Sequence, residues 1–209
     1  MAERIDPEFV ERARRILRRR DPILGGVIRT VGACALRRRG DPYRFLVRSI
    51  LYQQISGHAA RAIEARLHAS FGGGVPEPAR LREADAAKLR AVGLSRQKID
   101  YLRAIATAFD DRVLDGRRLA RMADDDVVEA VTQVRGVGEW TAHMLLMFSL
   151  GRPDVLPVGD YGVRKAARDL YGLADLPKRA ELESLGEPWR PYRSIATWYL
   201  WRSMDGITP

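Results

Sequence analysis

The short segment at residues 134–142, VRGVGEWTA, places two glycines one residue apart at the start of a predicted helix. Gly136 and Gly138 lack a Cβ, so their amides can approach an anion closely, and the dipole of the following helix favours negative charge there. Val127 and Val131 mark the apolar face of a helix that precedes the glycines. The pattern predicts two helices joined by a tight hairpin, and a nucleic acid phosphate is the natural ligand of such a turn.

Helical periodicity extends over most of the remaining chain. Asp6-Pro7 and Asp41-Pro42 are typical pairs of an N-cap and a first helical residue, and Ser56 can cap a further helix. Helices are also expected from residue 139 to about 150 and from 191 to about 204. Because no long segment alternates between apolar and polar residues with period two, we expect an all-α fold.

Charge and cysteine content limit the possible partners and cofactors. The 209 residues carry a formal charge of +9, which favours a polyanionic partner. Cys34 is the only cysteine, so neither an intrachain disulfide nor a four-thiolate iron–sulfur cluster can form, and we expect a buried, inert thiol. The chain shows no signal-peptide pattern and no apolar run of about 18 residues or more. We therefore expect a cytoplasmic, nucleoid-associated protein.

Asp160 is an acidic residue in a chain with a net positive charge. It ends a loop at residues 151–160 that contains Leu156 and Pro157, and helical periodicity resumes directly after it. Phosphate binding does not explain a negative charge beside a bound strand, so Asp160 is a candidate for chemistry. A second reading is a helix N-cap, and both can hold together.

Four ordered motifs resemble those of the helix-hairpin-helix DNA glycosylases, and especially their AlkA-type 3-methyladenine DNA glycosylase II branch. The resemblance covers roughly residues 40 to 204. The motifs are residues 51–56 (LYQQIS), 93–98 (GLSRQK), 136–160 with the hairpin and Asp160, and 188–201 (PWRPYRSIATWYLW).

The resemblance implies a two-lobed all-α fold with the active site in the cleft between the lobes. One lobe would span about residues 51–155, and residues 1–50 with 156–209 would form the other. Larger AlkA-type proteins have an extra N-terminal domain, and none is expected here. The implied partner is damaged double-stranded DNA, bound by a monomer without an obligate protein partner.

Site residues follow from the resemblance position by position. Asp160 falls on the catalytic aspartate, and Gln54 falls on the wedge that fills the gap left by an extruded nucleotide. The implied DNA-binding set is Gln53, Gln54, Arg96, Lys98, Arg135, Gly136, Gly138 and Thr141. The carbonyls of Thr132, Val134 and Val137 fall where family hairpins hold a monovalent cation, Na⁺ or K⁺, that would be structural. No cofactor is expected for catalysis.

Trp140 sets the expected reaction. Family members that also cleave the DNA backbone carry a lysine at this position, which forms a Schiff base with the sugar. With an indole there, the resemblance implies a monofunctional enzyme that releases alkylated, cationic purines. The base pocket is assigned to Trp140, Trp201 and Tyr52, because aromatic faces attract cations, whereas Trp189, Trp198 and Tyr199 are expected in the core.

Two other functions are weighed against this one. A non-catalytic helix-hairpin-helix module would grip phosphates but needs neither the aspartate nor the glutamine pair. A bifunctional lyase or adenine-mismatch enzyme would need the lysine and the cluster cysteines that are missing here. Deaminated and etheno bases stay open as further substrates.

Overall fold

The computed structural model describes residues 5–37 and 40–204, and the part of the chain that it describes is helical without any strand. This confirms the all-α prediction. Within the described residues, no helix is both long and apolar enough to cross a membrane. The chain divides into two compact units, and each is described by itself.

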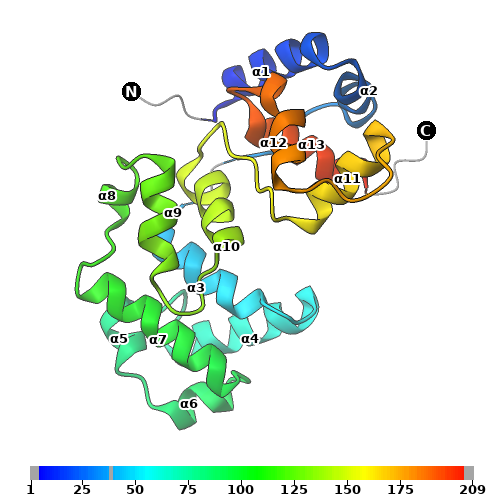
Figure 1. Cartoon of the computed structure of the whole chain (residues 1–209). Helices are drawn as coiled ribbons and strands as arrows, with labels where there is room; N and C mark the ends of the chain where they lie inside the picture. Colours follow the sequence, from blue (N-terminus) through cyan, green and yellow to red (C-terminus); the bar gives the residue numbers. More distant parts are fainter. Residues whose placement is uncertain (1–4, 38–39, 205–209) are drawn as a thin grey trace. The chain divides into compact units, whose positions relative to one another are not determined.

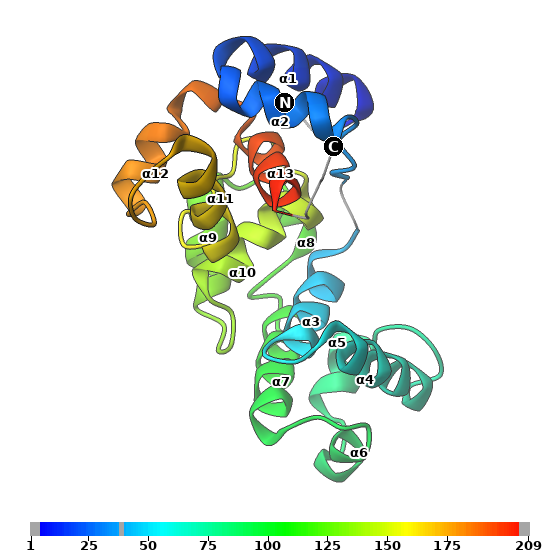
Figure 2. The same cartoon turned by 90° about the vertical axis from the view of Figure 1, so that its right-hand side faces the viewer.

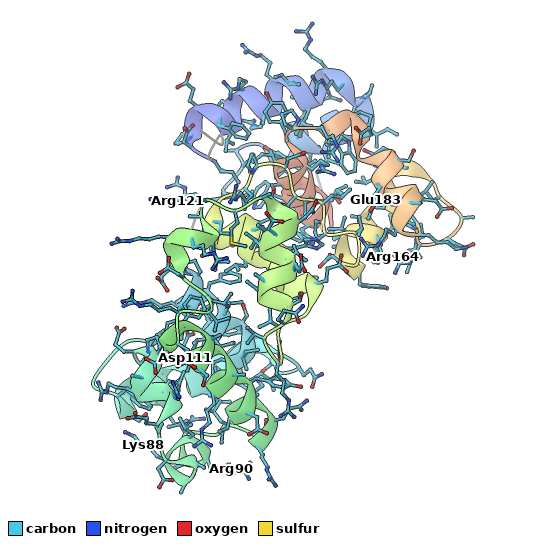
Figure 3. The ribbon with its side chains drawn as sticks, turned by 60° about the vertical axis from the view of Figure 1, so that its left-hand side comes forward. Lys88, Arg90, Asp111, Arg121, Arg164 and Glu183 are labelled. Atoms are coloured by element: carbon cyan, nitrogen blue, oxygen red, sulfur yellow. The ribbon has the colours of Figure 1, made fainter. Side chains whose placement is uncertain are left out.

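Unit 2 comprises Gly40–Leu145. Helix α7 packs against α3 and α5, and Figure 1 shows α5 beside α7. Leu46, Ile50, Leu102 and Ile105 are fully buried and form part of its core. Charged side chains such as Lys88, Arg90 and Arg121 are exposed on this unit (Figure 3). Its helices are α3 (Pro42–Tyr52), α4 (Gly57–Ser70), α5 (Pro78–Arg82), α6 (Ala86–Ala91), α7 (Arg96–Asp110), α8 (Gly116–Leu119), α9 (Asp124–Thr132) and α10 (Glu139–Met144).

Unit 1 comprises Met1–Arg39 and Leu146–Pro209. Helix α13 packs against α1, α2 and α11, as the views in Figures 1 and 2 show. Trp189 and Tyr199 are fully buried, which agrees with their expected place in the core. Its helices are α1 (Pro7–Arg20), α2 (Pro22–Val31), the π-helix η1 (Leu145–Leu150), whose first residue belongs to unit 2, α11 (Tyr161–Tyr171), α12 (Arg179–Leu185), the 3-10 helix η2 (Glu187–Trp189) and α13 (Arg193–Ser203).

The boundaries of the units differ from those expected. They fall after Arg39 and after Leu145, whereas boundaries near residues 51 and 155 were expected. Helix α3 belongs to unit 2 because it packs against α4 and α7. The helix expected from 139 to about 150 is α-helical only as far as Met144, where it becomes the π-helix.

Aspartates cap the helices at the predicted places. The carboxylates of Asp6 and Asp41 accept hydrogen bonds from the amides of Phe9 and Arg44, at 2.7 and 3.0 Å, and a proline follows each aspartate. Such a cap satisfies one of the backbone donors that an α-helix leaves unpaired at its start. The paired Asp-Pro signals in the sequence thus fix where α1 and α3 begin.

Candidate active site and DNA-binding hairpin

The hairpin between α9 and α10 is a tight turn that depends on glycine. Gly136 has φ +94°, which favours glycine, and a Cβ added there would lie 2.6 Å from Cδ2 of the Tyr101 ring. The amide of Val137 donates to the carbonyl of Val134 at 3.0 Å, which closes the turn. Gly136 is therefore required both for the backbone conformation and for the close packing of Tyr101.

Helix α10 begins directly after this turn. Its N-cap is Gly138, at φ −97°, and the cap provides no side-chain hydrogen bond to the first amides of the helix. A Cβ built on Gly138 would meet nothing within 4 Å. A helix start with an open cap of this kind can bind an anion through its backbone amides.

Trp140 and Thr141 lie next to each other on α10 in different surroundings. The Trp140 side chain is 50% exposed, which suits the predicted pocket wall. The Thr141 side chain is buried, at 3% exposed, because the helical phase turns it inward together with Ala142 and Leu145. A contact of Thr141 with DNA would therefore be made by its backbone amide, which lies in the first turn of α10.

The loop between α3 and α4, residues 53–56, contains the predicted wedge. Gln54 is exposed and has φ +57°, an uncommon conformation for a residue with a Cβ. Gln53 is half-buried, and its Nε2 donates to the carbonyl oxygen of Gly136 at 3.1 Å. The wedge loop is therefore hydrogen-bonded to the hairpin within unit 2.

The predicted basic contacts have different surroundings. Arg96 and Arg135 are exposed, and the Arg135 guanidinium lies 5.8 Å from the centre of the Tyr101 ring. Lys98 is half-buried, its Nζ donates to the Leu51 carbonyl at 2.7 Å, and burial lowers its pKa. One of the three donors of the Lys98 ammonium is thus used by the end of α3.

Tyr52 is held by two neighbours. Its hydroxyl donates to Oε2 of Glu64 at 2.8 Å, and the Arg48 guanidinium lies 4.1 Å from the ring centre. Arg48 Nε also donates to Oε1 of Glu64 at 3.1 Å. A protein cation thus covers one face of Tyr52, and that face is not available to a cationic base. This limits the predicted pocket role of Tyr52 to its other face or edge.

Asp160 is half-buried at the start of α11. Its Oδ1 accepts the amide of Val163 at 2.7 Å, which is the N-cap expected from the sequence. The same Oδ1 accepts Nε1 of Trp201 at 3.0 Å. These two donors fix the rotamer of the carboxylate.

Trp201 is packed as well as hydrogen-bonded. Its ring stacks on Phe148 with centroids 6.0 Å apart and an angle of 16° between the planes. Gly162 is adjacent: a Cβ there would lie 3.1 Å from Oδ1 of Asp160 and 3.3 Å from Cδ1 of Trp201. A larger residue at position 162 would require these side chains to shift by a few tenths of an ångström. Trp201 was predicted as a pocket wall, and the structure adds a direct bond to the predicted catalytic carboxylate.

The loop that leads to Asp160 is held by the start of α13. Arg193 forms a two-point ion pair with Asp154, Nε to Oδ1 at 2.8 Å and Nη2 to Oδ2 at 3.0 Å, and both side chains are largely buried. Ser194 Oγ donates to the Arg152 carbonyl at 2.7 Å and accepts the Val155 amide at 3.0 Å. One helix thus orders this loop at residues 152–155 and, through Trp201, at Asp160.

Sequence reasoning missed two features of this region. Tyr161 follows Asp160 directly and is 65% exposed. An aromatic residue next to a candidate catalytic carboxylate is a signal that would have found it. The Asp154–Arg193 pair was also missed, because no local pattern links residues that are 39 positions apart.

Comparisons with known proteins identify the family of this chain. The family model "HhH-GPD superfamily base excision DNA repair protein" matches residues 47–191. DNA-3-methyladenine glycosylase 1 of Schizosaccharomyces pombe is 37% identical over 165 residues, which are 78% of this chain and 72% of that protein.

Two solved structures are similar over nearly the whole chain. The S. pombe 3-methyladenine DNA glycosylase in complex with abasic DNA has a TM-score of 0.84 and 33% identity, covering 95% of this chain and 99% of the other. DNA-3-methyladenine glycosidase from Bacillus halodurans has a TM-score of 0.85 and 35% identity, with 93% and 89% coverage.

The chain belongs to the HhH-GPD superfamily of base excision DNA repair proteins. Its fold is that of these DNA glycosylases. Because its relatives are DNA-3-methyladenine glycosylases, the chain is a DNA N-glycosylase of base excision repair and not a non-catalytic module.

Proposed function

We propose that this chain is a monofunctional glycosylase that extrudes alkylated, cationic purines from double-stranded DNA and releases them by hydrolysis. The observation that carries the proposal is Asp160, whose carboxylate is fixed by Trp201 and by the start of α11. The names of the relatives, 3-methyladenine DNA glycosylases, support the same substrate class.

Binding begins at the hairpin. The amides at Gly138 and in the first turn of α10 bind a backbone phosphate, and the exposed Arg135 and Arg96 add positive charge. Extruding a base costs on the order of a few kcal/mol, and less for a damaged pair. Gln54, which is exposed next to the hairpin-bound Gln53, fills the gap and hydrogen-bonds the orphaned base.

The chemical step needs one carboxylate. As the bond between C1′ and the base nitrogen breaks, its electron pair neutralises the cationic base and the sugar becomes an oxocarbenium-like cation. Asp160 stabilises that positive charge and orients the water that adds to C1′, and one proton of this water is then released to the solvent. A purine that already carries a positive charge leaves without a strong general acid.

Trp140 explains both the selectivity for cationic purines and the absence of a lyase activity. Its half-exposed indole offers a face to a cationic purine, which is worth about 0.5 to 2 kcal/mol per good contact. Because it replaces the lysine of the lyases, no Schiff base forms and the product is an abasic site.

A monovalent cation fits the hairpin by its donor chemistry. The carbonyls of Thr132, Val134 and Val137 are neutral hard oxygens, and the Val134 carbonyl has a lone pair left beside its bond to Val137. Na⁺ or K⁺ at these atoms adds positive charge beside the phosphate site.

We propose further that the protein acts as a monomer at the nucleoid in the cytoplasm.

Base release from methylated DNA tests the proposal. Duplex DNA treated with dimethyl sulfate is incubated with the protein, and free 3-methyladenine and 7-methylguanine are measured. Asn is as good an N-cap as Asp, so Asp160→Asn keeps the fold and DNA binding while release falls by a thousandfold or so. No release by the wild-type protein, or full release by Asp160→Asn, overturns the proposal, and trapping by borohydride overturns its monofunctional part.

A further inference from the structure

The wedge loop has an unusual backbone that its neighbours hold in place. Gln54 and Arg112 are the non-glycine residues with positive φ in the described part of the chain. Gln54 is exposed, and Ile55 beside it is 37% exposed. A left-handed residue of this kind persists where the surrounding contacts determine it.

Two hydrogen bonds hold the chain directly before Gln54. Gln53 Nε2 donates to the Gly136 carbonyl at 3.1 Å. Lys98 Nζ donates to the Leu51 carbonyl at 2.7 Å, close to the last residue of α3. Both donors are half-buried side chains that reach backbone oxygens far away in the sequence.

Helix α7 supports both bonds. It supplies Lys98 in its first turn, and one turn later it supplies Tyr101, whose ring lies against Gly136 without room for a Cβ. The Tyr101 hydroxyl accepts Nε2 of Gln97 at 2.7 Å, which orients the ring. The carbonyl that Gln53 uses therefore has a position set by α7.

We propose that Gln53 and Lys98 are positioning residues that hold Gln54 in its protruding conformation and couple it to the phosphate-binding hairpin. Binding of the phosphate and insertion of the wedge then occur as one movement of a rigid unit. A loop ordered before binding loses less conformational entropy when it enters the duplex. The inference rests on the proposed function, because it assumes that Gln54 fills the gap left by an extruded base.

Isosteric substitutions remove each bond. Gln53→Glu keeps the shape but replaces the donor by a carboxylate that faces the Gly136 carbonyl, and Lys98→Met keeps the length of the side chain but removes the ammonium. Lys98→Arg retains donors and is expected to restore part of the function. Arg103→Met is the matched control, because it removes a cationic side chain from the same helix whose Nη2 donates at 2.7 Å to the Ala84 carbonyl and not to the wedge loop.

The readout separates positioning from folding. Single-turnover release at saturating enzyme is measured for 7-methylguanine paired with cytosine and for 7-methylguanine opposite an abasic site, where no base pair has to be broken. We expect Gln53→Glu and Lys98→Met to lower the release rate for the paired substrate about tenfold relative to the rate for the unpaired one, while Arg103→Met keeps this ratio within twofold of wild type. Thermal unfolding of each variant accompanies the measurement.

Each outcome decides the question. Equal losses on both substrates mean that the two bonds only support the fold, and unchanged rates mean that they do nothing for the wedge; either result overturns the inference. Absence of release from both substrates by the wild-type protein would instead refute the proposed function.

Discussion

The indole Nε1 of Trp201 donates a hydrogen bond to Oδ1 of Asp160 at 3.0 Å. Trp201 lies on α13 and Asp160 precedes α11, two helices that pack against each other in unit 1. The bond fixes the orientation of the carboxylate that is proposed to stabilise a sugar cation.

Trp201→Phe tests this bond because it keeps the stacking on Phe148 and removes the donor. A hydrogen bond to a charged group is worth about 1.5–3 kcal/mol, so we expect kcat for base release to fall about tenfold or more. Affinity for abasic DNA should stay within twofold. Trp198→Phe, on the same helix and packed against Tyr199, is the control; an equal loss there would show that the indole bond has no special role.

The Arg193–Asp154 pair gives a second prediction. Arg193→Gln leaves a largely buried carboxylate without its two-point partner, and we expect the free energy of unfolding to fall by about 2 kcal/mol. Because the loop leads to Asp160, kcat should fall more than KM changes, and Arg193→Lys should recover part of it.

Arg190 provides the matched control for that experiment. It also donates to Asp154, at 2.9 Å, but its side chain is 48% exposed, and exposed ion pairs contribute little. Arg190→Gln should therefore change the denaturant midpoint and kcat only slightly. Similar effects of the two substitutions would contradict the role given to Arg193.

The two hairpin glycines are predicted to respond differently to alanine. Gly136→Ala introduces a strained φ and an overlap with Tyr101, so we expect a loss of about 2 kcal/mol or more in the free energy of unfolding. Gly138→Ala has open space and should keep the stability while weakening DNA binding, since the new methyl group meets the phosphate.

Urea titration and fluorescence anisotropy with a labelled duplex measure the two quantities. A Gly136→Ala protein as stable as the wild type would refute the packing argument. If Gly138→Ala bound DNA with unchanged affinity, the phosphate would not lie at this helix start.

Local signals in the sequence predicted the local structure. The Asp-Pro pairs predicted the starts of α1 and α3, and the acidic residue at 160 predicted both a cap and a candidate for chemistry. Each of these depends on a few consecutive residues, whose backbone donors are satisfied by the side chain just before them.

Long-range contacts were not predictable in the same way. Gln53 meets the Gly136 carbonyl 83 residues away, and Lys98 meets the Leu51 carbonyl, and no local pattern in the sequence indicates either partner. The inward turn of Thr141 likewise depends on the phase of α10 against its core. Such partners are chosen by packing between helices, which one sequence does not reveal.

Cys34 gives the last prediction and corrects an expectation. The side chain is half-buried, whereas a buried, inert thiol was expected. Burial nevertheless raises the pKa of Cys34 from 9.0 to about 11. At pH 8, a shift of two pKa units lowers the thiolate fraction about a hundredfold, and the thiolate is the reactive form. The native protein should therefore react with a disulfide reagent about a hundred times more slowly than the urea-unfolded chain, and the difference should shrink as the pH approaches 11.

The raised pKa of Cys34 also makes the stability of the folded protein depend on pH. The folded pKa lies above the unfolded value, so folding favours the neutral thiol. The stabilisation is fully present below about pH 9 and is lost as the pH rises through about 11. Cys34→Ala should remove this part of the alkaline destabilisation, measured as the urea midpoint against pH, and an unchanged profile together with rapid labelling at pH 8 would show that the thiol lies in a solvent-like environment.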